Sequence, residues 1–483
     1  MTLRALDFQI FMHNIQTRMP FRYGIAEMTA VPHLFLQLEC EVDGQISNGV
    51  AADNLIPKWF TKDPKTSYED DLRDMLRVIQ QAGEIAVQVG SEQNVFDLWL
   101  QIHQGQKTWA SEYGYPPLLW NFGVSLVERA LIDAYCRAKG VTFPAVVKEN
   151  NLGIRLSDIH PVLEGYLPAE LLPAHPLQEI NIRHTVGLSD YISDAEIEEN
   201  RRLNDGLPQS LEANIRAYGV RYFKIKINGD VEQDAERLCR IDAVLRECGV
   251  DDYYFTLDGN EQYRSVAAFR TFWERIANET SCSPHMARLL FVEQPFHRDV
   301  ALIEETRKDL NAWSDRPLII IDESDAEINS MQTALKSGYA GTSHKNCKGV
   351  FKSIANACLL KHIHEQEPHR SLILSGEDLA NIGPIALLQD LTVMSVLGIK
   401  HIERNGHHYF AGLDSFPVEV QQQILSSHSD LYHQPAEFPT LKIRNGRIGI
   451  ASLLRSPFGL NDEFSPGQWF QTENSWNFES LQI

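Results

Sequence analysis

The run YFKIKIN at residues 222–228 begins a series of short apolar stretches that each end in charged side chains. The series continues with YYFTLDGN (253–260), LLFVEQP (289–295), LIIIDES (318–324) and the weaker GTSHKNCKG (341–349). Successive charged positions are 23 to 35 residues apart, at Lys226, Asp258, Glu293, Asp322 and Lys345. A strand, a crossover helix and two loops take roughly 30 residues, so each interval accommodates one βα unit. Charges repeated at strand ends therefore predict one functional face of a parallel barrel.

The same strand-then-helix patterning extends over residues 179–412 and predicts a (β/α)8-type barrel, a modified TIM barrel of the α/β class. Residues 1–145 combine alternating strands with helical patterning and are expected to form an α+β capping domain. Residues 146–178, rich in proline and leucine, are interpreted as a connector or insertion. Residues 413–483 are expected to return to the capping domain, since Asn445-Gly446 is a strong hairpin signal.

Composition excludes several classes of protein. A formal charge of −21 on 483 residues disfavours nucleic acid as a partner, and no stretch approaches the ~18 apolar residues of a membrane span. The seven cysteines are scattered, without a CxxC pair, and the opening residues lack the pattern of an export signal. These features predict reduced thiols and a cytoplasmic location.

Three of the charged positions are acids that follow apolar runs typical of buried parallel strands. Asp258, Glu293 and Asp322 would meet at one mouth of a barrel, although each can instead be a helix N-cap. Gathered carboxylates repel one another unless a cation lies among them, and a set without histidine or cysteine favours Mg²⁺ over zinc. The acids are therefore candidate Mg²⁺ ligands, with Mn²⁺ as a substitute.

Lysines supply the other charges of the series. Lys224 and Lys226 lie two positions apart in a strand, so both side chains point to one face, the barrel interior or its mouth. Lys345 should approach from the opposite side, but Lys348 is near enough that a register shift would exchange the two. Such lysines are also common on solvated strands and loops, and it is the apolar context and the following acids that favour a shared pocket.

The order K-x-K, D-x-N, E-x-P, D-E-S and a further lysine resembles the enolase superfamily, in particular its muconate-lactonising enzyme (muconate cycloisomerase) and mandelate-racemase-like branch. The segment VSLVERALIDAYCRAKG (124–140) is similar to the family's last capping-domain helix, and the pattern around Ile382-Gly383 to its seventh barrel strand. The resemblance implies abstraction of the proton α to the carboxylate of a small substrate, with the enediolate held by Mg²⁺. A racemase, epimerase or cycloisomerase is favoured over a dehydratase, and a homo-oligomer is expected.

The family's functional positions carry over residue by residue. The resemblance makes Asp258, Glu293 and Asp322 the metal ligands. It makes Lys226 and Lys345 acid/base groups on opposite faces of the substrate. Lys224 would hold the substrate carboxylate and lower the pKa of Lys226, because neighbouring cations disfavour a further positive charge. Weaker candidates for substrate binding are Arg22, Tyr23, Asn260, Lys348 and Glu377, of which the first two, with Arg18, fall where the family carries a mobile loop.

The sequence departs from the family pattern at several points. SLILSGEDLAN contains no histidine of a histidine–aspartate base pair, which favours the lysine–lysine type. Lys348-Gly349-Val350 replaces the usual double glycine, and HIERNG stands where dipeptide epimerases carry D-x-D. Two other functions remain open: a Schiff-base lyase that uses Lys226, and a non-catalytic pseudoenzyme or binding protein on the same fold.

Overall fold

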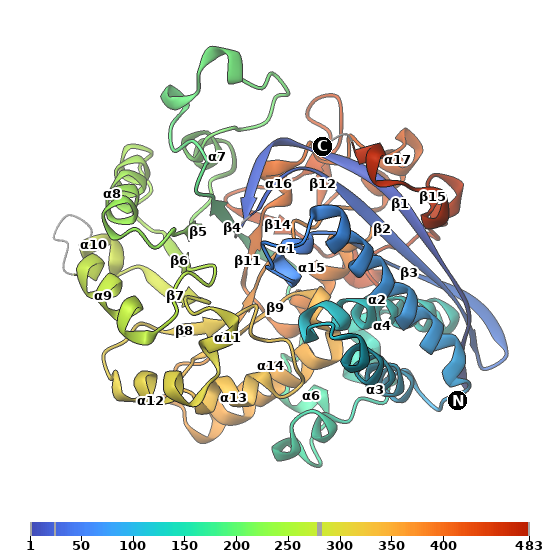
Figure 1. Cartoon of the computed structure of the whole chain (residues 1–483). Helices are drawn as coiled ribbons and strands as arrows, with labels where there is room; N and C mark the ends of the chain where they lie inside the picture. Colours follow the sequence, from blue (N-terminus) through green and yellow to red (C-terminus); the bar gives the residue numbers. More distant parts are fainter. Residues whose placement is uncertain (1, 24–25, 278–282, 482–483) are drawn as a thin grey trace.

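The computed structural model describes residues 2–23, 26–277 and 283–481, and within them a closed barrel of eight parallel strands is the central element (Figure 1). Each strand pairs with the next in chain order, and the last pairs back to the first, from His401 with Asn181 to Arg404 with His184. The strands are β4 (Glu179–Val186), β5 (Tyr222–Lys226), β6 (Tyr254–Asp258), β7 (Leu289–Glu293), β8 (Ile319–Ile321), β9 (Gly341–His344), β10 (Ile373–Gly376) and β11 (His401–Arg404). The predicted barrel is confirmed.

Helices follow the barrel strands and surround them. Helix α8 begins after Asp230, whose side chain accepts a hydrogen bond from the Gln233 N–H, and it buries Leu238, Ile241 and Leu245 at helical spacing. These helices are α7 (Leu211–Tyr218), α8 (Val231–Glu247), α9 (Val266–Ala277), α10 (Ser283–Met286), α11 (Arg298–Ala301), α12 (Glu304–Ala312), α13 (Ser330–Lys336), α14 (Val350–Gln366), α15 (Ala386–Leu397) and α16 (Gly406–Tyr409). In the described part of the chain, no helix combines the length and apolarity that crossing a membrane requires.

The N-terminal region forms the predicted α+β capping domain, an antiparallel sheet with helices packed on it (Figure 1). Asp43 and Gly44 both have positive φ, 50° and 82°, as a tight hairpin between two of its strands requires. Gly49 allows a close approach to helix α4, since a Cβ there would lie 2.0 Å from the Ala130 carbonyl oxygen. The elements are β1 (Leu3–Tyr23), β2 (Ala26–Val42), β3 (Gln45–Asn54), α1 (Pro57–Phe60), α2 (Tyr68–Val89), α3 (Val95–Tyr113) and α4 (Pro117–Lys139).

The C-terminal segment contacts both the barrel and the cap. Asn445 and Gly446 have φ of 50° and 72° and form the predicted hairpin turn. Its second strand pairs with β4 of the barrel rather than with the capping sheet, which it was expected to join. The return to the cap comes later, where β15 pairs with β1. The elements are α17 (Val418–Ser427), β12 (Tyr432–His433), β13 (Thr440–Leu441), β14 (Arg447–Gly449) and β15 (Gln471–Thr472). The exact limits of the four segments stay predictions.

Two short helices lie in the connector region, α5 (Phe143–Lys148) and α6 (Pro168–Leu171). The free cysteines of the described chain are Cys40, Cys136, Cys248, Cys347 and Cys358. Cys239 is disulfide-bonded, so the expectation that every thiol is reduced is wrong for this residue.

Candidate active site

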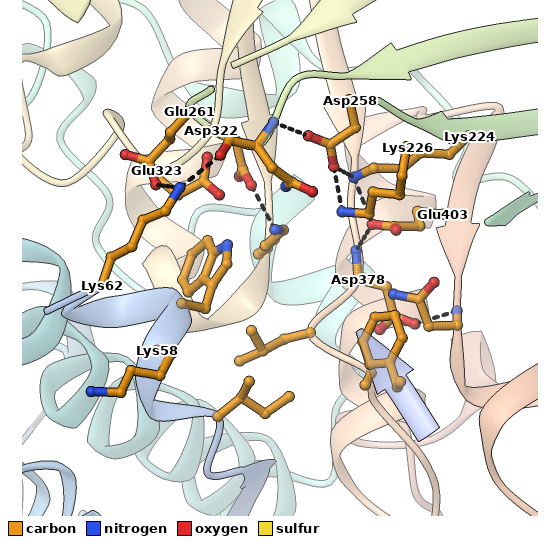
Figure 2. Close-up of a pocket in the computed structure, with 18 of the residues that line it drawn as sticks. Lys58, Lys62, Lys224, Lys226, Asp258, Glu261, Asp322, Glu323, Asp378 and Glu403 are labelled. Carbon is orange, nitrogen blue, oxygen red and sulfur yellow. Dashed lines mark hydrogen bonds and ion pairs between the residues drawn. The ribbon is translucent and has the colours of Figure 1, made fainter. Parts of the chain in front are cut away.

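A pocket lies at the C-terminal ends of the barrel strands, under residues of the capping domain (Figure 2). Lys226 and Asp258 are the last residues of β5 and β6, and Asp322 follows β8 directly. The cap contributes apolar walls from Ile56 and Trp59, in and beside α1. The strand ends thus deliver charged groups to one mouth, as the spacing predicted, and the cap encloses them.

Lys226 and Lys345 face this pocket from opposite walls. Lys226 ends the second barrel strand, and Lys345 follows the sixth, so half of the barrel separates them. The Lys226 Nζ atom lies 2.6 Å from Asp258 Oδ2, and the Lys345 Nζ atom lies 2.7 Å from Asp322 Oδ2. The Lys345 ammonium also lies 4.3 Å from the centroid of the Trp59 ring, a cation–π contact that shields it from water.

Lys224 lies deeper, among four carboxylates. Its Nζ atom is 2.7 Å from Glu293, 3.0 Å from Asp258, 2.9 Å from Glu377 and 3.1 Å from Glu403. Burial disfavours the ammonium, but the surrounding negative charges outweigh this effect and hold the pKa of Lys224 well above its usual range. Lys224 is therefore a fixed positive charge at the floor of the site.

Glu293 is the least compensated of the three predicted metal ligands. It is 1% exposed, and neither of its carboxylate oxygens has a hydrogen-bond partner, although Oε2 forms the ion pair with Lys224. Burial, together with Asp258 and Glu377, raises the pKa of Glu293 well above its usual range. Such a carboxylate favours a nearby cation, because a positive charge would restore its ionised form.

The three predicted ligands are chemically suited to a divalent cation, but in this structure they are paired with lysines. Asp258, Glu293 and Asp322 come from adjacent strands, and hard cations such as Mg²⁺ bind carboxylate oxygens. Lysine ammonium groups form ion pairs with all three carboxylates, however. The described residues also contain no group of three or more histidine, cysteine, aspartate or glutamate side chains arranged to hold a metal ion. A cation would have to replace lysine contacts.

The structure separates Lys345 from Lys348. Lys345 lines the pocket, whereas Lys348 lies behind it, with Nζ 2.6 Å from Ser343 Oγ and 3.2 Å from Asp322 Oδ1. The two lysines thus hold different oxygens of Asp322. Burial disfavours ionisation of Asp322, but the two lysines hold its pKa well below the usual range.

The weaker substrate-binding candidates fall in different places. Asn260 lines the pocket, and its backbone N–H donates to Asp258 Oδ1 at 2.9 Å. Glu377 is fully buried outside the pocket lining, between Lys224 and Arg183. Arg22 is exposed and does not line the pocket. The side chain of Tyr23 lies outside the described part of the structure.

Arg18, from the same segment of β1, joins the cap to the barrel loops. It pairs with Asp205 at 2.5 Å and donates to the His408 carbonyl oxygen at 2.6 Å. Because protein oxygens accept the hydrogen bonds of its guanidinium group, Arg18 has a structural role here.

Several pocket residues were not predicted from the sequence. Glu403, in β11, lines the pocket and accepts hydrogen bonds from Thr185 Oγ1 at 2.8 Å and from the Asp378 N–H at 2.9 Å. The rule that found the other acids also applies to Glu403, since it lies at the end of a barrel strand. Glu323 also lines the pocket, and burial next to Asp322 raises its pKa to about 7.

A second unpredicted group holds the cap over the pocket. Arg298 pairs with Glu261 and donates to the carbonyl oxygens of Trp59 at 2.9 Å and Phe60 at 2.7 Å. Lys62 from the cap reaches the same Glu261 at 3.0 Å. Burial disfavours the Glu261 carboxylate, but these cations lower its pKa to about 2. No local sequence pattern signals these contacts.

The sequence matches no protein-family model and no curated protein. The structure matches a muconate lactonizing enzyme from Pseudomonas fluorescens complexed with muconolactone, with a TM-score of 0.57, 14% identity and coverage of 92% of this chain and 94% of that chain. It matches an enolase from Bradyrhizobium complexed with magnesium and mandelic acid (TM-score 0.57, 13% identity, 98% and 97% covered). A dipeptide epimerase from Enterococcus faecalis V583, complexed with Mg and the dipeptide L-Leu-L-Tyr, also matches (TM-score 0.54, 14% identity, 84% and 92% covered). The chain therefore shares the fold of these enolase-superfamily enzymes over nearly its full length.

Proposed function

We propose that this protein is a Mg²⁺-dependent enzyme that removes the proton α to the carboxylate of a small substrate. The observation that carries the proposal is the placement of Lys226 and Lys345 on opposite walls of one pocket, above carboxylates from adjacent strands. An α-carbon bound between the two amines is open to proton transfer on both faces. Racemisation and epimerisation use both groups, whereas cycloisomerisation and syn elimination of water need only one; of these reactions we favour racemisation, epimerisation or cycloisomerisation.

Asp258, Glu293 and Asp322 would hold the cation. When bound, Mg²⁺ would neutralise the negative charge that develops on the substrate carboxylate as the α-proton leaves. Lys224 has to give up its contacts with Asp258 and Glu293 for this purpose. Two of its partners remain available, Glu377 at 2.9 Å and Glu403 at 3.1 Å, so its ammonium stays compensated.

The two pocket lysines divide the proton transfer between them. Lys226, as the neutral amine, takes the α-proton on its Nζ atom, while Lys345 delivers a proton from its own Nζ atom to the opposite face. Burial disfavours the Lys345 ammonium, but Asp322 outweighs this and holds its pKa above the usual range, so Lys345 carries the proton in this structure. A cation on Asp322 would weaken this hold and make the ammonium a better proton donor. Trp59 covers this ammonium and excludes water from it. The reverse reaction exchanges the two roles.

Incubation in D₂O tests the proposal whichever product the enzyme forms. The Mg²⁺-loaded protein would be offered acid sugars, N-acyl amino acids, dipeptides and muconates, and deuterium would be located by NMR. We expect deuterium at a carbon next to a carboxylate, loss of this exchange with EDTA and recovery with Mg²⁺. Replacing Lys226 and Lys345 together by methionine should abolish the deuterium exchange. The exposed Lys361→Met variant should behave as wild type, because Lys361 pairs with Glu365 on the helix surface and is not among the residues that line the pocket.

Two results would count against the proposal. One is the absence of exchange with the whole panel when Mg²⁺ is present. The other is an activity that survives EDTA and forms a covalent adduct at Lys226 on borohydride treatment, which would identify a Schiff-base lyase.

A further inference from the structure

Most of the cations in the pocket wall are already paired within the protein. Arg298 uses its donors on both oxygens of Glu261, at 2.8 Å each, and on two backbone carbonyls of α1. Lys62 donates to the Asn260 carbonyl oxygen at 2.6 Å and pairs with Glu261. These side chains fasten the cap to the barrel, so their positive charge is not directed at a ligand.

Lys58, the remaining lining cation outside the proposed machinery, is held in the same way. Its Nζ atom lies 2.5 Å from Asp71, 2.6 Å from the Asp63 carbonyl oxygen and 2.8 Å from the Thr66 carbonyl oxygen. In Figure 2 its side chain extends away from the barrel strand ends. Among the described residues that line the pocket, the positive charge open to a ligand is therefore confined to the three lysines of the proposed machinery.

Two polar side chains of the pocket wall each have an oxygen without a hydrogen-bond partner. Glu323 is 4% exposed, and its Oε2 atom has no hydrogen-bond partner. Asn405, which follows β11, is 3% exposed, and its Oδ1 atom also has no partner. Both of these atoms are oxygens that accept hydrogen bonds, so a donor group on a ligand would satisfy them. A buried polar group without a partner costs free energy, which a matching ligand group would recover.

We infer that the substrate is a carboxylic acid whose remaining part carries hydroxyl or N–H groups. These groups donate hydrogen bonds to Glu323 and Asn405. A second carboxylate of the muconate type would bring no donor to these two oxygens and would find no open cation to bind it, and a hydrocarbon chain would leave both oxygens unpaired. The inference rests on the proposed function, which assigns the first carboxylate to the cation and the lysines. It narrows the substrate class of the same pocket.

Isothermal titration in the presence of Mg²⁺ tests the inference with four probes. Gluconate and hexanoate are matched in carbon number but differ in hydroxyl groups, L-alanyl-L-alanine supplies N–H donors, and cis,cis-muconate supplies a second carboxylate. We expect gluconate or alanyl-alanine to bind about tenfold or more tighter than hexanoate and muconate, the gain from one or two hydrogen bonds to buried acceptor oxygens. Tighter or equal binding of hexanoate or muconate would overturn the inference, and so would the absence of binding by all four.

Variants of Glu323 assign the preference to this residue. Glu323→Ala should abolish the preference for gluconate or alanyl-alanine over hexanoate and muconate. Glu323→Gln keeps the shape and one accepting oxygen, so it should reduce the preference less than Glu323→Ala does. Glu304→Gln, on an exposed acid that pairs with Arg307, is the matched control, and melting curves confirm folding. A preference that persists unchanged in both Glu323 variants would contradict the assignment.

The D₂O experiment separates this inference from the proposed function. Deuterium in hexanoate or muconate alone would support the α-proton chemistry and overturn the inferred substrate class. A Glu323-dependent preference for gluconate or alanyl-alanine, with no exchange in any probe or panel acid, would support the inferred binding chemistry and overturn the proposed reaction.

Discussion

Replacing Glu128 by glutamine should remove a pH-dependent part of the protein's stability. Glu128 lies in α4 of the capping domain, is 1% exposed and accepts hydrogen bonds from the N–H groups of Val350 at 3.0 Å and Phe351 at 2.7 Å. These N–H groups begin α14, directly after the loop that carries Lys345 and Lys348. The cap thus supplies the acceptor that the N-terminus of a barrel helix requires.

The size of the effect follows from the pKa of this carboxyl. Burial, only partly offset by the two backbone N–H groups, raises the pKa of Glu128 from 4.5 to about 7. A group whose pKa is raised on folding contributes stability below its unfolded pKa and loses it as the pH rises through the folded pKa. Between pH 5 and pH 8 the loss is about 2.5 kcal/mol. At about 1 kcal/mol per degree for a chain of this length, it corresponds to roughly 2–3 °C in melting temperature.

Melting curves of wild type and Glu128→Gln at pH 5 and pH 8 measure this contribution. We expect the melting temperature of the variant relative to wild type to be about 2–3 °C more favourable at pH 8 than at pH 5. The double difference removes all other titrating groups. Glu149→Gln, an exposed acid near the same domain junction, is the control and should show no such change. An equal offset at both pH values, or one of opposite sign, would show that folding does not raise the pKa of Glu128.

Three further outcomes are expected. Lys226→Met or Lys345→Met should each reduce α-deuterium exchange, measured by NMR, by about 10²- to 10⁴-fold for the substrate isomer whose α-proton faces the replaced lysine, with circular dichroism confirming that the variant is folded; an unaffected rate for both isomers would remove that lysine from the mechanism. Arg129→Met leaves the fully buried Asp53 unpaired and should lower the free energy of unfolding by about 3–5 kcal/mol. This loss should appear as a fall of about 3–5 °C in melting temperature, and a change below about 1 °C would contradict it. Mg²⁺ at about 100 times its Kd should raise the melting temperature by roughly 2–3 °C, reversibly with EDTA, and Ca²⁺ or K⁺ at equal ionic strength serves as the control.

The barrel and the acids at its strand ends were predictable because their signals are local. An apolar run followed by a charged residue marks the end of a buried parallel strand, and the interval near 30 residues marks the crossover. The same rule covers Lys226, Asp258 and Asp322, which the structure brings to one pocket. It also covers Glu403, which was missed because HIERNG was compared only with a D-x-D pattern.

Other features depend on register and tertiary contact, which a single sequence does not encode locally. Lys345 is extended, with φ of −142° and ψ of 136°, and continues the direction of β9, whereas Lys348 lies in the following turn and passes behind Asp322. Glu377 turns away from the pocket because the buried Arg183 needs a counter-charge. The contact of Arg298 with Trp59 joins residues 239 positions apart, so no periodicity announces it.

Crystallography with Mn²⁺ shows whether Asp258, Glu293 and Asp322 share one cation, since the anomalous signal of Mn²⁺ locates the ion. We expect one strong peak within coordination distance of oxygens from Asp258, Glu293 and Asp322, with the Lys224 ammonium withdrawn toward Glu377 and Glu403. A saturated crystal without a peak there, with Lys224 still between Asp258 and Glu293, would contradict it.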